Sequence, residues 1–130
     1  MNDVYKNYFD SMPCYLTIQD RDLHLVAANK KFQDEFGEID GRYCYQIYKK
    51  RSEKCENCPV ERTFRDGLPH RSEELVRNQK GQDVWVIVDT TPIFDDNGNI
   101  TSVMEMSTDF TENKLLHHQL KQSQEKYRLL

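Results

Sequence analysis

The sequence predicts an α+β domain built on one five-stranded antiparallel sheet. Alternating apolar and polar residues at 14–19 and 23–27 predict two strands, and three further alternating segments follow Pro69. Between these groups, residues 28–68 carry helix-start and helix-end residues at the spacing of short helices. Two strands, several helices and then a three-stranded meander is the order of an α+β fold.

Local signals place each element. A flanking helix is expected over residues 1–12. Asn29 suits the N-cap of the next helix, which Gly37 ends, and short helices are expected at 45–49 and 59–66. The last three strands are expected at 70–77, 83–94 and 100–109, the final two joined by the hairpin signal Asn97-Gly98.

The composition describes a single domain. The chain has 130 residues, of which 37% are hydrophobic and 31% charged. Its net charge of −4 argues against a phosphate-backbone partner, so we expect no nucleic acid. The longest apolar run, Val84–Val88, is far shorter than the roughly 20 residues that span a bilayer, and residues 1–5 do not lead into a signal peptide. We therefore expect a cytoplasmic protein and no membrane contact by this segment.

Three of the four cysteines gather in the middle of the chain, at Cys44, Cys55 and Cys58. A Cys-x-x-Cys pair can reach one metal ion or form a disulfide. With Cys14 as a candidate fourth ligand, four thiolates would suit zinc or an iron–sulfur cluster. Three interpretations stay open, namely metal or cluster ligation, a reversible dithiol switch, and simple packing.

The residues after Cys58 predict its chemistry. Pro59 fits the first helical position and Gly67 the residue past the helix end, which places Cys58 at the N-cap. The positive end of the helix dipole favours a thiolate there, and Lys54 adds positive charge. We therefore expect Cys58 to be a reactive or metal-binding thiolate.

Several motifs occur in a fixed order. They are Ala28-Asn29-Lys30-Lys31-Phe32 after two strands, Gly41 before the short helices, Gly67 after them, Asn97-Gly98 before the last strand, and Asp109-Phe110-Thr111-Glu112 closing it. In this order they resemble the PAS sensor domain family, with the domain at residues 13–112. The resemblance implies the sheet order 2-1-5-4-3, a pocket between sheet and helices, and sensing rather than catalysis. The cysteine pattern is similar to that of a PAS subgroup in microbial signalling proteins such as sensor histidine kinases.

Two PAS cofactors are disfavoured. Flavin-binding members carry Asn-Cys-Arg-Phe-Leu-Gln where this chain has Tyr43-Cys44-Tyr45-Gln46-Ile47, so the polar groups that hold flavin are missing. Covalent haem attachment needs His after Cys-x-x-Cys, and Pro59 stands there. A small-molecule ligand remains open, and the expected pocket lining is Tyr43, Tyr45, Tyr48, Phe64, Trp85, Ile87, Met104 and Met106.

Residues 113–130 predict a coiled-coil linker helix. Leu116, Leu120, Tyr127 and Leu130 recur at spacings of four, seven and three, which indicates a parallel seam and a homodimer through the flanking helices. Asp109 and Thr111, with Leu116 and Leu120, are the expected signal-transfer residues. Residues 125–130 repeat the acidic-x-Tyr-basic-x-apolar pattern of residues 3–8, so we expect a further module downstream.

Three functional hypotheses follow. The first is a sensory and dimerisation module of a multidomain protein, most simply a sensor histidine kinase, with no enzyme activity of its own. It would detect a small-molecule, metal or redox signal. The second is a metal- or iron–sulfur-binding redox protein that uses Cys44, Cys55 and Cys58. The third is a purely structural dimerisation module whose pocket is filled by side chains.

Overall fold

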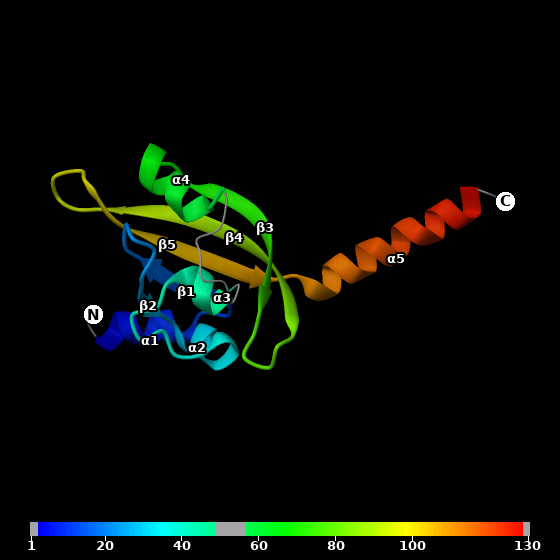
Figure 1. The fold of residues 1–130 in the computed structure, drawn as a ribbon, viewed down its shortest axis with the longest axis horizontal. Helices are drawn as coiled ribbons and strands as arrows, with labels where there is room; N and C mark the ends of the chain where they lie inside the picture. Colours follow the sequence, from blue (N-terminus) through cyan, green and yellow to red (C-terminus); the bar gives the residue numbers. More distant parts are fainter. Residues whose placement is uncertain (1–2, 49–56, 129–130) are drawn as a thin grey trace.

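The computed structural model describes residues 3–48 and 57–128 (Figure 1). Cys55 therefore lies outside the described residues. The elements in chain order are α1 (Asp3–Ser11), β1 (Tyr15–Gln19), β2 (Leu25–Ala28), α2 (Lys30–Phe36), α3 (Cys44–Tyr48), α4 (Pro59–Asp66), β3 (His70–Arg77), β4 (Asp83–Phe94), β5 (Ile100–Asp109) and α5 (Thr111–Arg128).

The five strands form one sheet in the order β2-β1-β5-β4-β3, and every neighbouring pair is antiparallel. The predicted fold class and strand order are confirmed. The second strand begins at Leu25 rather than at Leu23, because Leu23 has a φ of 69° in a turn. Asp20 Oδ1 closes that turn by accepting hydrogen bonds from the amides of Asp22 and His24.

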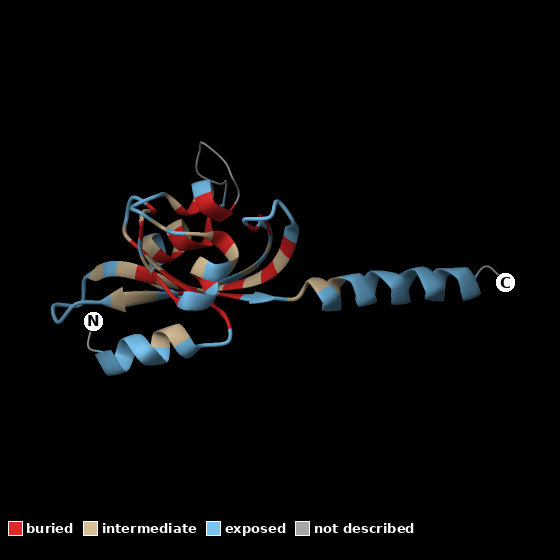
Figure 2. Ribbon diagram, turned by 90° about the horizontal axis from the view of Figure 1, so that it is seen from below, coloured by how far each residue is buried: buried red, intermediate tan, exposed pale blue. Residues whose placement is uncertain are grey.

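The two faces of the sheet are covered differently. Helices α2, α3 and α4 lie on one face, called the inner face here, and the buried residues gather between them and the sheet (Figures 1 and 2). Helix α1 lies on the opposite, outer face, and α5 projects away from the end of β5 (Figure 2). The inner face therefore holds the core and any enclosed site.

Aromatic rings join α2 and α3 to the sheet. Phe32 and Phe36 of α2 pack with ring centroids 5.1 Å apart, and Tyr48 of α3 meets them edge-on at 5.1 and 4.7 Å. Tyr15 of β1 completes the cluster, 5.0 Å from Phe36. The helical spacing of the two phenylalanines puts both on the buried side of α2.

Asn29 fastens the start of α2 to β1. Asn29 is the N-cap of α2, as predicted, and its Oδ1 accepts a hydrogen bond from the amide of Phe32 at 3.1 Å. The same oxygen accepts from the amide of Leu16 at 3.0 Å, while Nδ2 donates to the Cys14 carbonyl at 2.8 Å. One fully buried amide side chain therefore holds a helix and a strand together.

Helix α4 starts and ends as predicted. Cys58 is its N-cap, Pro59 opens it, and Gly67 ends it with a φ of 71°, a left-handed conformation that glycine adopts without strain. The hydroxyls of Thr63 on α4 and Thr90 on β4 share a hydrogen bond of 2.7 Å. The Thr63–Thr90 hydrogen bond fixes the middle of α4 over the sheet.

Candidate functional site

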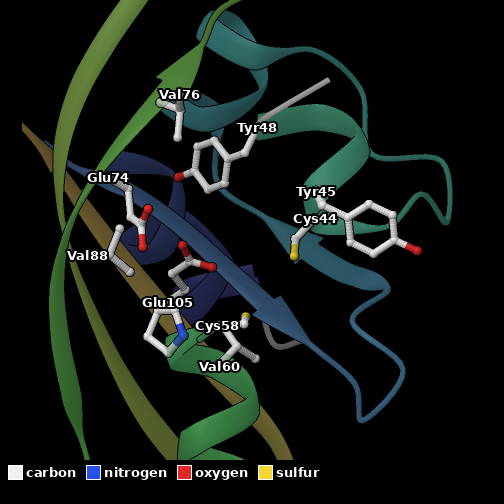
Figure 3. Close-up of a pocket in the computed structure, with 10 residues that line it drawn as sticks. Cys44, Tyr45, Tyr48, Cys58, Val60, Glu74, Val76, Val88 and Glu105 are labelled. Atoms are coloured by element: carbon white, nitrogen blue, oxygen red, sulfur yellow. The ribbon is translucent and has the colours of Figure 1, made fainter. Parts of the chain in front are cut away.

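A small cavity of about 40 Å³ lies between α3, the start of α4 and strands β3, β4 and β5 (Figure 3). At this size it holds only a few water molecules, so a larger molecule enters only if lining side chains move. Its lining residues are Cys44, Tyr45, Tyr48, Cys58, Pro59, Val60, Glu74, Val76, Val88 and Glu105.

Two carboxylates face this cavity. Figure 3 shows Glu74 of β3 and Glu105 of β5 turned toward the same space. Glu105 is only 6% exposed and accepts a hydrogen bond from Gln19 Nε2, while Glu74 accepts one from the Ser72 hydroxyl at 3.2 Å. The sequence reasoning did not select either residue. A Glu between two methionines, Met104 and Met106, was the available signal for Glu105.

Glu105 affects the ionisation of Tyr48, which lines the same cavity. Burial is the main reason why the pKa of the Tyr48 phenol lies well above its usual range, and Glu105 raises it further. The Tyr48 hydroxyl meanwhile donates to Ser107 Oγ at 3.0 Å. Tyr48 is therefore a neutral hydrogen-bonding group at neutral pH.

Cys44 and Cys58 both line the cavity as thiols, each less than a tenth exposed. The thiolate expected at Cys58 is wrong, because its surroundings favour the neutral thiol. Burial raises its pKa to about 11, and the backbone amides of Glu61 and Val60 lower it only in part. Desolvation of the thiol therefore outweighs the effect of the helix N-terminus on this pKa.

Cys14 lies directly before β1 and near Lys31. Burial raises the pKa of its thiol and Lys31 opposes the rise. Within residues 3–48 and 57–128, the one group of three potential metal ligands close enough to share an ion is Asp20, Asp22 and His24, which contains no cysteine. Cys14 as a fourth ligand with Cys44 and Cys58 is therefore not supported by the geometry.

The expected pocket lining divides between the two faces. Tyr45 and Tyr48 line the cavity, whereas the ring of Tyr43 stacks between Tyr45 at 5.1 Å and His24 at 4.2 Å. Phe64 lies under the guanidinium of Arg21, at 5.2 Å.

The other four residues of the expected lining were assigned to the wrong face of the sheet. The residues that lie on the outer face are Trp85, Ile87, Met104 and Met106. Successive strand residues point to opposite faces, and Val86, Val88, Val103 and Glu105 occupy the inner positions.

The outer face forms a second, shallow groove with α1. Met104 and Met106 line it together with Leu16 and Ile18 of β1, and α1 contributes Tyr5, Tyr8, Phe9 and Met12. Tyr5 and Tyr8 are each 64% exposed, so the apolar side of α1 remains largely accessible.

The junction between β5 and α5 is held by hydrogen bonds to β4. Asp109 Oδ1 accepts from the Thr111 amide at 2.9 Å, and Thr111 Oγ1 accepts from the Trp85 amide at 3.0 Å. The Phe110 amide donates to the Trp85 carbonyl at 2.9 Å. Beyond this junction, the side chains of Leu116 and Leu120 are more than half exposed.

These features define a class of protein, an α+β domain with a small cavity between its helices and its sheet and a projecting terminal helix. Residues 9–115 match the PAS fold, and the chain belongs to the PAS sensor domain family. The family expected from the motif order is thereby confirmed. No curated protein is significantly similar in sequence.

Solved structures share the fold at low sequence identity. An RNA-binding light-oxygen-voltage receptor matches with a TM-score of 0.77 and 20% identity, over 94% of this chain and 36% of its own. The PAS domain of a Colwellia psychrerythraea protein matches with 0.70 and 15%, over 85% and 99%. The Vibrio cholerae VqmA dimer matches with 0.68 and 16%, over 90% of this chain and 56% of that chain. The chain thus spans about half the length of VqmA.

None of the helices in the described parts of the chain combines the length and apolarity that a bilayer crossing requires.

Proposed function

We propose that this chain is the sensory and dimerisation module of a multidomain signal-transduction protein, with a sensor histidine kinase as the parent and no catalytic activity in the module itself. The observation that carries the proposal is the course of β5. Glu105 on its inner side lines the cavity, and the strand ends at Asp109, one residue before α5 begins. A change at the cavity therefore has a continuous strand through which it can reach the helix.

Helix α5 supports the dimerisation part of the proposal. Leu116, Leu120 and Tyr127 are 54%, 58% and 72% exposed along an 18-residue helix that projects from the domain (Figure 2). An exposed apolar seam of this kind suits a parallel partner helix. VqmA, which shares the fold, is itself described as a dimer.

The cavity is the proposed receiving site. Its small volume favours a small molecule, a metal ion or a redox change at the thiols over a bulky cofactor. VqmA, which also has a structure bound to DPO, supports ligand binding by this fold. The alternative is a purely structural dimerisation module. In that case the cavity would be a packing defect that binds nothing.

A second candidate function is a metal- or iron–sulfur-dependent redox protein. The observation that favours it is that Cys44 and Cys58 line one cavity. Elemental analysis and an absorption spectrum of anaerobically purified protein test it. Iron with broad visible absorption supports a cluster, zinc in colourless protein supports a structural site, and metal-free protein counts against both.

Two measurements test the sensory proposal. Leu116→Asn and Leu120→Asn should each weaken self-association roughly tenfold or more in sedimentation, because each buries less apolar surface in both partners. Leu68→Asn, at an equally exposed leucine outside α5, is the control. At the cavity, Glu105→Gln should change amide exchange across residues 107–114. The proposal is wrong if the Leu116 and Leu120 variants keep the parent's dimer affinity and Glu105→Gln keeps the parent's amide exchange at residues 107–114.

A further inference from the structure

The first turn of α5 is held against the sheet by Lys114. Its Nζ lies 4.6 Å from the centroid of the Trp85 ring and 5.9 Å from that of Phe110, and it forms a 3.2 Å ion pair with Glu73 Oε2. The Trp85 and Phe110 rings meet edge to face with centroids 6.4 Å apart. One ammonium group therefore combines a cation–π attraction with an ion pair.

These contacts join α5 to two strands that are not its neighbours in the sequence. Trp85 lies on β4 and Glu73 on β3, the edge strand of the sheet. The residue next to Glu73, Glu74, lines the cavity on the inner face. Because successive strand residues point to opposite faces, a shift of β3 at the cavity also moves Glu73 on the outer face.

We propose that Lys114 is a positioning residue that sets the direction in which α5 leaves the sheet and couples α5 to β3 and β4. The inference rests on the proposed sensory function, because it gives the same cavity a second route to the same helix, beside the one through β5. The side chains of Lys114 and Glu73 are 40% and 57% exposed. Attractions at such exposed sites are individually weak, so the contact is one that a modest signal can open.

The test compares three variants of the 130-residue chain. Lys114→Gln removes the cation, Lys114→Arg keeps it, and Lys121→Gln changes the lysine two turns further along the exposed part of α5. The readouts are amide exchange over residues 111–116 and the fluorescence of Trp85, the only tryptophan. Lys114→Gln should raise exchange roughly three- to tenfold and shift the Trp85 emission, whereas the other two variants should stay close to the parent.

A second substitution separates the two contacts of Lys114. Glu73→Gln removes the ion pair and leaves the cation over the rings, so it should reproduce only part of the increase in exchange. Unchanged exchange and emission in Lys114→Gln, or an equal change in Lys121→Gln, would overturn the inference. The proposed function fails in a different way. It is wrong when the Leu116 and Leu120 variants keep the parent's dimer affinity and Glu105→Gln keeps the parent's amide exchange at residues 107–114, although Lys114→Gln behaves as expected.

Discussion

Alkaline pH should destabilise this domain through Cys58. Burial raises the pKa of its thiol from 9.0, the unfolded reference, to about 11. Between these values the unfolded chain has lost the thiol proton while the folded chain retains it. The folded state then binds more protons, so the free energy of unfolding falls as pH rises above 9. A difference of two pKa units corresponds to about 2.7 kcal/mol, of which about 2 kcal/mol is lost by about pH 10.5.

The assay is urea unfolding of the reduced, metal-free protein between about pH 7.5 and 10.5, for the parent and Cys58→Ser. The parent should lose about 2 kcal/mol more than the variant over this range. Burial also raises the pKa of Tyr15 and Tyr48, but these groups act in both proteins and cancel in the comparison. Cys14→Ser is the control and should retain most of the parent's loss, since Lys31 opposes the rise at Cys14. If the free energy of unfolding falls equally with pH in the parent and in Cys58→Ser, solvent reaches the thiol and the reasoning is refuted.

Three other outcomes are expected. Asn29→Ala should lower the free energy of unfolding, measured in urea, by about 2–4 kcal/mol, because it removes three hydrogen bonds of a fully buried side chain. The control Asn97→Ala, in the exposed hairpin turn, should lower it far less. Removing residues 113–130 should leave the fold intact by circular dichroism and weaken self-association, and an unchanged dimer in sedimentation would count against α5 as the interface. At neutral pH, Cys58→Ser should lower the melting temperature and speed amide exchange at residues 44–48 and 57–60. If the variant melts and exchanges like the parent, Cys58 contributes packing alone.

The order of the elements could be predicted because its signals are local. Asn29 caps α2 and Gly67 ends α4 through contacts within a few residues of themselves. The position of Cys58 at the start of α4 is local in the same sense. Its ionisation is not, because the pKa depends on burial under α3 and the sheet, which the sequence around Cys58 does not reveal.

The face of the sheet that holds the cavity could not be predicted from strand alternation. Alternation divides β5 correctly into two sets of residues, but hydrophobicity then suggests that Met104 and Met106 face the core. The structure places Glu105 there instead and leaves the methionines in the groove with α1. The expectation that the more hydrophobic side of a strand faces the core fails here, because the apolar side of α1 partly covers the outer face as well.

The polarity of the inner face itself argues for a binding site. Thr17 and Gln19 of β1 are fully buried beside Glu105, and Thr17 Oγ1 and Gln19 Oε1 have no hydrogen-bond partner in the described part of the chain. Each such group costs about 1–3 kcal/mol relative to a satisfied one. A module kept only for dimerisation would be more stable with apolar residues at these positions. The inner face nevertheless retains a buried amide and a buried hydroxyl next to Glu105, which lines the cavity. Polar groups kept there at a cost in stability favour the sensory function over the purely structural one.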